Sequence, residues 1–449
     1  MIYTPDNYRH RIDSLFERHQ SVQSVGFGKE SYKPGLEGMR ELDAALGRPS
    51  EKFRSIHVAG TNGKGTVCSM LASALSATGL HVGLYTSPHI SDFRERMKII
   101  SPDGCELIPE KDVWDFLELG EPLFDGRSFF EITTAMAFHW FAAREVDIAV
   151  IETGLGGRLD STNIIVPEIS IITGIGLDHC AILGDTRALI ATEKAGIFKP
   201  GVPALVWADD PETTPSFLAA AGRTHSPLFF ATDFTTGMDD ATSLSARDMR
   251  QDAEGQDTGW AALNIRTVLA ALELIGVEAD RDALLDFSAR TGLRGRWETH
   301  ELPEATVIMD IGHNPPALRG NFARLSAMGR PLVIVYGIMA DKDLDGIAPM
   351  MPGKYRGDCA TEDTASGNDA VYIPVAPATV RALPAAALAE RLTELRPDLN
   401  VTAPASSVAD GLRKAFALAH GPMPAKPVIY VGGSTFVVAE AIDALTQVI

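Results

Sequence analysis

The stretch HVAGTNGKGT, residues 57–66, runs from the end of an apolar strand through a glycine-rich turn into a helix. The FRSIHVA run is apolar and β-branched enough for a buried strand, and Lys64–Thr78 has the apolar spacing of a helix that Gly79 ends. Glycines tolerate backbone angles that side chains forbid, so several N–H groups of such a turn can face one anion at a helix N-terminus. The order of strand, turn and helix therefore predicts a phosphate-binding loop.

The polar residues of the same turn fit a nucleoside triphosphate. Lys64 adds a mobile positive charge, and Thr66 offers a hydroxyl to a magnesium ion between the β- and γ-phosphates. An ordinary turn is the alternative, but the glycines, lysine and threonine all stand at the offsets of a phosphate loop. We therefore expect ATP to be bound by Gly60, Thr61, Asn62, Gly63, Lys64, Gly65 and Thr66.

Composition describes a globular protein with small-molecule partners. The 449 residues suggest two or three domains, and 45% hydrophobic with 22% charged residues is ordinary for such a chain. The net charge of -19 argues against nucleic acid and anionic membranes as partners, because phosphate contacts need excess lysine and arginine. Four cysteines without a CxxC pair predict free thiols in a reducing cytoplasm, and neither a signal peptide nor a membrane span is expected.

Strands and helices alternate through the N-terminal part, which predicts a mainly parallel sheet covered on both faces. Candidate strands cover residues 53–59, 81–87, 147–153 and 168–176, and candidate helices cover 4–19, 34–46, 64–78, 109–124, 129–144 and 186–195. Two loop-like segments, 21–33 and 231–259, interrupt this pattern. Ligands bind at the carboxyl ends of parallel strands, and Ser87, Glu152 and His179 all follow strand ends. We expect them to converge with the phosphate loop.

A second, smaller α/β unit is predicted after Trp297. Its candidate strands are residues 305–310, 331–337, 370–375 and 427–433, its candidate helices are 314–328, 384–395, 407–419 and 435–447, and residues 355–369 form a loop. The predicted domains are therefore 1–296, with the ATP-binding loop, and 297–449.

Single polar residues have ordinary interpretations as well. A glutamate that closes a strand, such as Glu152, is often a structural carboxylate, and a lone histidine such as His179 is often a hydrogen-bonded loop residue. Lys194 lies on a helix, where a surface lysine paired with Glu193 is the default interpretation. Their positions after strand ends favour a functional role for Glu152 and His179.

Ten motifs, in this order along the chain, resemble those of the folylpolyglutamate synthase and dihydrofolate synthase family, within the Mur-type ATP-dependent amide ligases. They are HVAGTNGKGT, YTSPHISDFRERMKI, FFEITTAMAF, IETGLGGRLDSTN, LDHCAILGDT, EKAGIFKPGVP, GLRGRWE, DIGHNPPAL, GIMADKD and VGGSTFVVAE. The resemblance implies an α/β fold, with a P-loop domain of the Mur-ligase type and a smaller, Rossmann-like C-terminal domain that carries the glutamate-ligase function. It also implies that ATP phosphorylates a carboxylate, which the amine of L-glutamate then attacks.

The resemblance also assigns residues. Thr66, Ser87, Glu152 and His179 match the family's magnesium ligands, and Lys194 stands where the family has a carbamylated lysine. The implied catalytic residues are Lys64, His179, Lys194 and His313. Further residues implied to contact ATP are Asn264, Arg296 and Asp310. The implied substrate residues on the pterin side, or in loops that position it, are Phe130, Arg158 and Asp160. Those implied near the glutamate site are His313, Asn314 and Ser407.

Three functions are compatible with these motifs. The leading hypothesis is a cytoplasmic, monomeric ligase that joins L-glutamate to dihydropteroate or to folates, with ATP, Mg2+ and also K+ as implied by the resemblance. A ligase acting on UDP-muramoyl precursors of peptidoglycan is an alternative within the same superfamily. An ATP-driven switch, which hydrolyses ATP and joins nothing, is an alternative from another class.

Overall fold

The computed structural model describes residues 3–19, 34–234, 260–353, 370–421 and 426–448. They fall into two compact units, one within residues 3–293 and one within 294–448. The division follows Leu293, a few residues before the domain boundary predicted at 296. The predicted loops at 21–33 and 355–369, and most of the predicted loop at 231–259, lie outside the described residues.

The N-terminal unit is built on an eight-stranded sheet with the strand order β4-β3-β2-β5-β1-β6-β7-β8. Its strands are β1 (Arg54–Ala59), β2 (Val82–Tyr85), β3 (Met97–Ser101), β4 (Gly104–Leu107), β5 (Ile148–Glu152), β6 (Ile169–Ile172), β7 (Ala204–Val206) and β8 (Leu228–Phe230). Strand β3 pairs antiparallel with β2 and with β4, and the other pairs are parallel. The predicted mainly parallel sheet is therefore confirmed.

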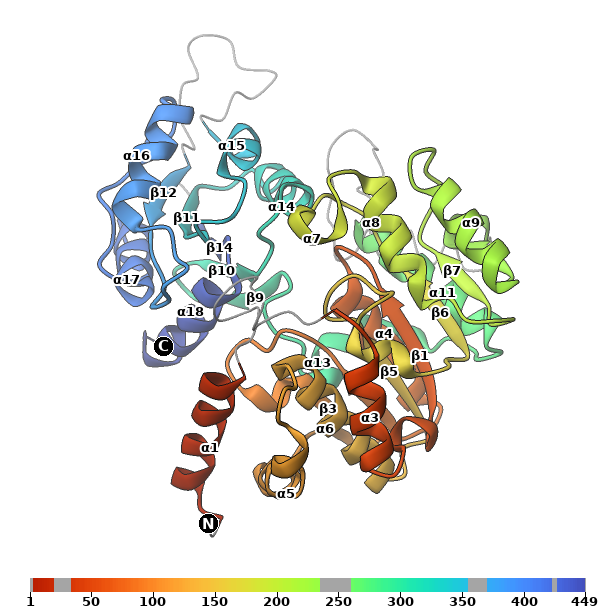
Figure 1. Ribbon diagram of the computed structural model, residues 1–449. Coiled ribbons are helices and arrows are strands. Elements are labelled where there is room, and N and C mark those ends of the chain that lie inside the picture. Colours follow the sequence, from red (N-terminus) through yellow and green to blue (C-terminus); the bar gives the residue numbers. More distant parts are fainter. Residues whose placement is uncertain (1–2, 20–33, 235–259, 354–369, 422–425, 449) are drawn as a thin grey trace. The chain divides into compact units, whose positions relative to one another are not determined.

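Helices cover both faces of this sheet (Figure 1). They are α1 (Pro5–Arg18), α3 (Glu37–Ala45), α4 (Lys64–Ala77), α5 (Glu110–Gly120), α6 (Phe129–Ala143), α7 (Cys180–Leu183), α8 (Arg187–Lys194), α9 (Thr214–Thr224), α11 (Trp260–Leu274), α12 (Arg281–Leu285) and α13 (Phe287–Thr291). Helix α4 packs with α11, α12 and α13 on one face, whereas α6 lies on the other. Helix α3 begins at Glu37, with Leu36 as its N-cap, and therefore starts later than the predicted Pro34.

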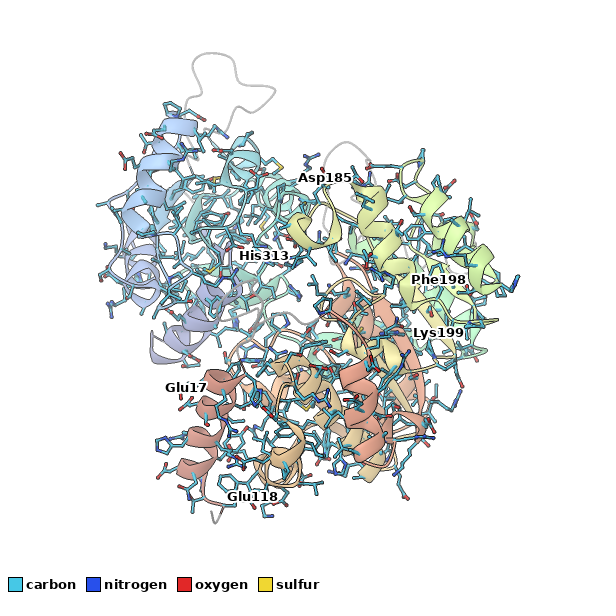
Figure 2. The ribbon with its side chains drawn as sticks, viewed as in Figure 1. Glu17, Glu118, Asp185, Phe198, Lys199 and His313 are labelled. Atoms are coloured by element: carbon cyan, nitrogen blue, oxygen red, sulfur yellow. The ribbon has the colours of Figure 1, made fainter. Side chains whose placement is uncertain are left out.

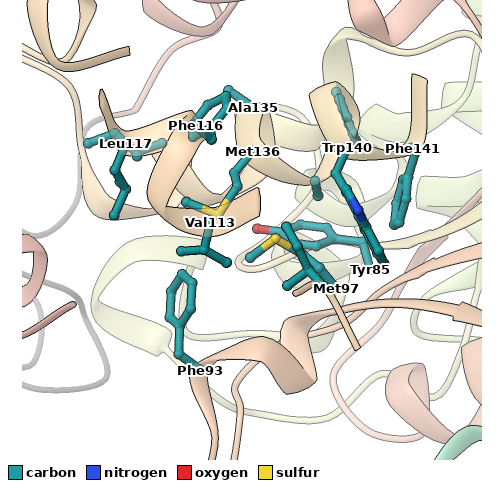
Figure 3. Packing of buried hydrophobic residues seen from close by; sticks show 14 of the residues in the cluster. Tyr85, Phe93, Met97, Val113, Phe116, Leu117, Ala135, Met136, Trp140 and Phe141 are labelled. Atoms are coloured by element: carbon teal, nitrogen blue, oxygen red, sulfur yellow. The ribbon is translucent and has the colours of Figure 1, made fainter. Parts of the chain in front are cut away.

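The alternation of side chains along β1 and β5 separates two hydrophobic clusters. Ile56 and Val58 face the cluster of α4, and Ile151 faces the cluster of α6. In the α6 cluster, Tyr85 and Phe141 lie among the residues that Figure 3 draws. Both clusters contain fully buried strand residues, which explains why these strands read as continuous apolar runs.

The C-terminal unit has a six-stranded sheet of order β13-β12-β11-β14-β10-β9, in which β9 is antiparallel to β10. The strands are β9 (Glu298–Glu301), β10 (Thr306–Asp310), β11 (Leu332–Tyr336), β12 (Val371–Pro374), β13 (Asn400–Val401) and β14 (Val428–Gly432). The helices are α14 (Pro315–Ala327), α15 (Leu344–Ile347), α16 (Ala385–Leu395), α17 (Val408–Ala419) and α18 (Thr435–Val448).

The sequence predicted four of these six strands and missed β9 and β13. Strand β9 reads ETHE and has no apolar residue, and β13 has two residues, so neither produces a hydrophobic pattern. Strands β7 (ALV) and β8 (LFF) were also missed; they are apolar, but three residues are too few to establish a strand period. Within the described part of the chain, no helix combines the length and apolarity that crossing a membrane requires.

We predict that Leu71→Ala in the buried helix α4 lowers the free energy of unfolding by about 2–5 kcal/mol, because it leaves a cavity in the core. Leu218→Ala, on the surface of α9 with 56% of the residue exposed, is the matched control and changes this free energy by less than about 0.5 kcal/mol. Denaturant titration measures both. Equal losses would contradict the described packing of α4.

Candidate active site

The predicted phosphate loop joins β1 to α4, as the sequence indicated. The amide of Thr61 donates to the carbonyl of Gly174 (2.8 Å), just beyond β6, and the hydroxyl of Thr173 donates to the carbonyl of Asn62 (2.8 Å). Gly63 caps α4 in the left-handed region, with φ at 88°. The first half of the loop is thus fastened to the neighbouring strand end. The first amides of α4, which have no intrahelical partner, are left to face an anion.

Gly60 has no room for a side chain. Its φ is 156°, and a Cβ atom placed on it would stand 1.8 Å from the hydroxyl oxygen of Thr173. The carbonyl of Gly60 is also the shared acceptor of two lysines. The Nζ of Lys194 donates to the oxygen of Gly60 at 2.6 Å, and the Nζ of Lys64 donates to it at 3.1 Å.

Lys194 is buried, so its predicted default role as a surface lysine paired with Glu193 is wrong. Glu193 pairs with Arg158 instead, at 2.9 Å. Burial, followed by the nearby charge of Lys64, lowers the pKa of Lys194 from 10.5 to about 7. The amine of Lys194 is therefore largely neutral in a mildly alkaline solution.

Glu152 ends β5 with its carboxylate buried at the edge of the loop. One oxygen accepts a hydrogen bond from the amide of Ser87 (3.2 Å), and the other lies 3.8 Å from the Nζ of Lys64. Strands β2 and β5 are parallel neighbours, which brings their carboxyl ends together. The structure therefore unites Lys64, Ser87 and Glu152, as predicted.

The residues predicted for a magnesium ion offer hard oxygen atoms, from the carboxylate of Glu152 and the hydroxyls of Ser87 and Thr66. Magnesium in proteins is commonly held by one or two carboxylates together with phosphate oxygens, and this set fits that pattern. In the described ranges, no group of three or more His, Cys, Asp or Glu side chains could hold a metal ion. The predicted set is of another kind, because it includes two hydroxyls.

His179 lies between β6 and α7 in the left-handed region, with φ at 53°. Its Nε2 is 3.7 Å from a carboxylate oxygen of Asp178. Burial and the charge of Lys64 have the largest effects on the pKa of Lys194, and the charge of Asp178 raises this pKa to a smaller extent. The loop that carries Asp178 and His179 therefore lies within electrostatic range of Lys194. The metal-binding role of His179 stays a prediction.

Asn264 extends from α11 to the phosphate loop. A Cβ atom placed on Gly63 would stand 2.6 Å from the Oδ1 of Asn264. This Oδ1 is buried and has no hydrogen-bond partner among the residues that the structure describes. An unpaired buried acceptor is costly in a protein, and it suits a ligand that donates a hydrogen bond.

The three residues predicted for the pterin side lie in or against the loop of residues 153–160, which we call the β5 loop. Phe130 packs on Gly154, where a Cβ atom would stand 2.4 Å from its ring. Arg158 is paired with Glu193 on α8. Asp160 is buried and accepts a hydrogen bond from the amide of Leu155 (2.8 Å). In this structure Arg158 and Asp160 hold the loop, and Phe130 borders it.

In the C-terminal unit, Asp310 ends β10 and organises the next residues. Its carboxylate accepts hydrogen bonds from the amide of Trp297 (2.9 Å), the amide of Gly312 (2.7 Å) and the side chain of Asn321 (2.6 Å). Arg296, half-buried, precedes Trp297 directly. Asp310 and Arg296 are thus brought near each other by the backbone.

His313 follows β10 (Figure 2), and its Nδ1 hydrogen-bonds with the carbonyl of Ile311 at 3.0 Å. Asn314 caps α14 by accepting from the amide of Ala317 (3.0 Å). Ser407 caps a different helix, α17, so its predicted role near glutamate has a structural alternative.

No protein-family model matches the chain. The folylpolyglutamate synthase of Lacticaseibacillus casei is 32% identical over 406 residues, which are 86% of this chain and 89% of that protein. The chain belongs to the folylpolyglutamate synthase family. The resemblance inferred from the motifs is thereby confirmed.

Solved structures of the folylpolyglutamate synthase family share the fold. Escherichia coli FolC in complex with DHPP and ADP has a TM-score of 0.75 and 27% identity, and the alignment covers 98% of each chain. A bifunctional folylpolyglutamate synthase/dihydrofolate synthase with Mn, AMPPNP and L-glutamate has a TM-score of 0.71 and 28% identity, with 92% of this chain and 95% of that chain covered. The predicted Mur-ligase type of α/β fold is confirmed.

Sequence reasoning missed several buried polar residues inside the motifs of the folylpolyglutamate synthase family. His57, Thr162 and Asn163 are all buried, and each makes a hydrogen bond with another motif segment. The signal was present, because a histidine within an apolar strand and three consecutive polar residues after Asp160 need buried partners. Thr173, which fastens the phosphate loop, stands in an apolar run and gave no separate signal.

We predict that Gly60→Ala abolishes nucleotide binding, because the new methyl group collides with Thr173 and displaces the loop. Gly79→Ala is the matched control, since Gly79 also has a positive φ, 97°, but no neighbouring atom within 4 Å. The control loses about 1–2 kcal/mol of folding free energy to backbone strain and keeps its nucleotide affinity. A fluorescent ATP analogue measures binding, and equal affinity in both variants would contradict the described loop.

Proposed function

We propose that this protein is an ATP-dependent ligase that joins L-glutamate to dihydropteroate, to folates that already carry glutamate, or to both. The observation that carries the proposal is the convergence of Lys64, Lys194 and Glu152 on the phosphate loop. Membership of the folylpolyglutamate synthase family supports the same conclusion. One relative holds DHPP and ADP, and another holds Mn, AMPPNP and L-glutamate. These ligands suggest the three substrates of the proposal, which are an acid, a nucleotide and L-glutamate.

The chemistry explains why ATP is needed. A carboxylate reacts poorly with an amine because its leaving oxide is too basic. In the proposed reaction a carboxylate oxygen attacks the γ-phosphorus, ADP leaves, and an acyl phosphate forms. The nitrogen of glutamate then attacks the acyl carbon, loses its proton, and phosphate departs. Positioning and charge stabilisation supply most of the catalysis in such a reaction.

The residues of the N-terminal unit have distinct roles in this proposal. Lys64 and the first amides of α4 bind the phosphates, and Asn264 accepts a hydrogen bond from the nucleotide. Glu152, Ser87 and Thr66 would hold Mg2+, with His179 as a further ligand. When bound, Mg2+ would neutralise charge on the phosphates. In the C-terminal unit, we propose that Arg296 and Asp310 contact ATP and that His313, Asn314 and Ser407 serve glutamate.

We further propose that Lys194 is carbamylated. Its neutral amine adds to carbon dioxide, so that an N–C bond forms, the nitrogen releases one proton, and the neutral side chain becomes an anion. The pKa of about 7, lowered by burial and by Lys64, leaves enough neutral amine for this step. A negative carbamate would also relieve the repulsion between two lysines on one carbonyl. The proposal includes K+ as a second cation, a monomeric state and a cytoplasmic location, as the sequence predicted.

We expect ADP release only when both a pteroate or folate acid and L-glutamate are present. A panel of dihydropteroate and of tetrahydrofolate mono- and diglutamates then decides which acids are used. Turnover with a UDP-muramoyl acid alone would favour the peptidoglycan alternative. ADP release without acid and amine would favour a nucleotide switch.

In the same assay, Lys64→Ala lowers kcat/KM by about 10²–10³-fold or more, because the variant lacks the positive side chain that would stabilise the transferred phosphoryl group. Lys111→Ala, an exposed lysine paired with Asp115, is the control and keeps normal activity. Near-normal turnover of Lys64→Ala would refute the role given to the loop.

Lys194→Ala should lose activity and regain part of it with small carboxylates, which replace the carbamate. In the native protein, NMR with isotope-labelled bicarbonate should show a carbamate signal that weakens as the pH falls through about 7, because protonation removes the reactive amine. A missing signal in mildly alkaline solution, together with no rescue, would contradict carbamylation.

A further inference from the structure

Three buried polar side chains connect strand β1 to the β5 loop. The Nε2 of His57, on β1, is 2.8 Å from the hydroxyl of Thr162, and this hydroxyl donates to a carboxylate oxygen of Asp160. His57 and Thr162 are fully buried, and Asp160 is 5% exposed. The three residues come from two motifs about a hundred positions apart, so only the folded chain brings them together.

Hydrogen-bond accounting fixes the proton of His57. A threonine hydroxyl has one proton, and that of Thr162 goes to Asp160. The hydroxyl must therefore accept from His57, whose Nε2 carries the hydrogen. Burial, with a smaller effect from the charge of Lys199, lowers the pKa of His57 to about 3, so the ring is neutral. Its Nδ1 is buried without a hydrogen-bond partner in the described part of the chain.

Asp160 transmits this contact to the start of the β5 loop. Its second oxygen accepts from the amide of Leu155 (2.8 Å), three residues after Glu152. Leu155 follows Gly154, on which the ring of Phe130 packs so closely that no side chain fits. The chain of contacts that starts at His57 and Thr162 therefore ends at the surface that Phe130 shares with the loop.

The second half of the same segment has its own anchor. The side chain of Asn163 donates to the carbonyls of Arg158 (3.1 Å) and Gly196 (3.0 Å), near the end of α8. The Nζ of Lys199 (Figure 2) donates to the carbonyl of Asn163 at 2.8 Å. These contacts hold the later residues against the turn after Lys194. The first residues of the loop depend on Asp160 and on the strand contact of Thr153 with Val58.

We propose that His57 and Thr162 are positioning residues that act through Asp160 to fix the β5 loop, and that this sets how the acid substrate is held beside Phe130. This rests on the proposed function, in which Phe130 borders the acid side. Neither side chain needs to touch a substrate. Their effect is selective, because the phosphate loop has separate anchors at Gly174 and Thr173.

Thr162→Val tests the proposal, since valine keeps the shape of threonine and removes the hydroxyl. Thr162→Ser keeps the hydroxyl and is the matched control. Hydrogen exchange of a peptide covering residues 153–156 should become about tenfold faster or more in Thr162→Val, whereas a peptide covering 60–66 should be unchanged. The KM for the acid should rise about tenfold or more, with the KM for ATP within about twofold. Thr162→Ser should behave like the native protein.

Three outcomes would overturn the proposal: unchanged exchange at 153–156, an unchanged KM for the acid, or an equal rise in the KM for ATP. Should Thr162→Val fail to fold, His57→Leu and His57→Gln form a second pair, in which glutamine keeps an amide donor and leucine has none. His57→Gln should then retain native exchange and KM values, and His57→Leu should lose both. If the native protein uses no pteroate or folate acid, the proposed function fails, while hydrogen exchange still decides whether the side chains position the loop.

Discussion

The carbonyl oxygen of Gly60 is the point on which the N-terminal site depends. Two lysines, Lys64 and Lys194, donate to it, and Thr173 stands where a side chain would have to be. Only a residue without Cβ permits this close approach of Thr173. The turn therefore combines Gly63, which is left-handed at the start of the helix, with Gly60, which Thr173 approaches closely. A substitution of Gly60 would disturb the loop and both lysines that donate to it.

Two cations at one buried carbonyl repel each other, and the surrounding chain compensates this repulsion. Glu152 lies 3.8 Å from Lys64, and the lowered pKa of Lys194 lets that amine lose its charge. An anionic phosphate, or a carbamate on Lys194, would complete the compensation. The electrostatics of the residues thus favour an anionic ligand at the loop, even though the whole chain carries a net charge of -19.

Many polar residues of the family motifs hold backbone segments in place. Arg158 pairs with Glu193, Asp160 receives hydrogen bonds inside its own loop, and Asn314 and Ser407 cap helices. These residues are needed in this chain because a buried backbone requires partners for its polar groups. A motif residue can therefore be essential for a site through the loop it holds.

The sequence alone determined the strand, glycine turn and helix of the phosphate loop, the mainly parallel sheet and the family, because these depend on local periodicity and on contiguous motifs. It also placed Ser87 and Glu152 at the ends of strands through the same periodicity, whereas the structure showed that these two strands are neighbours. Only the tertiary structure decided that Lys194 is buried on the carbonyl of Gly60 and that His57 reaches the β5 loop through Thr162. Burial and hydrogen-bond partners depend on distant segments meeting in space, and no local pattern encodes which segments meet.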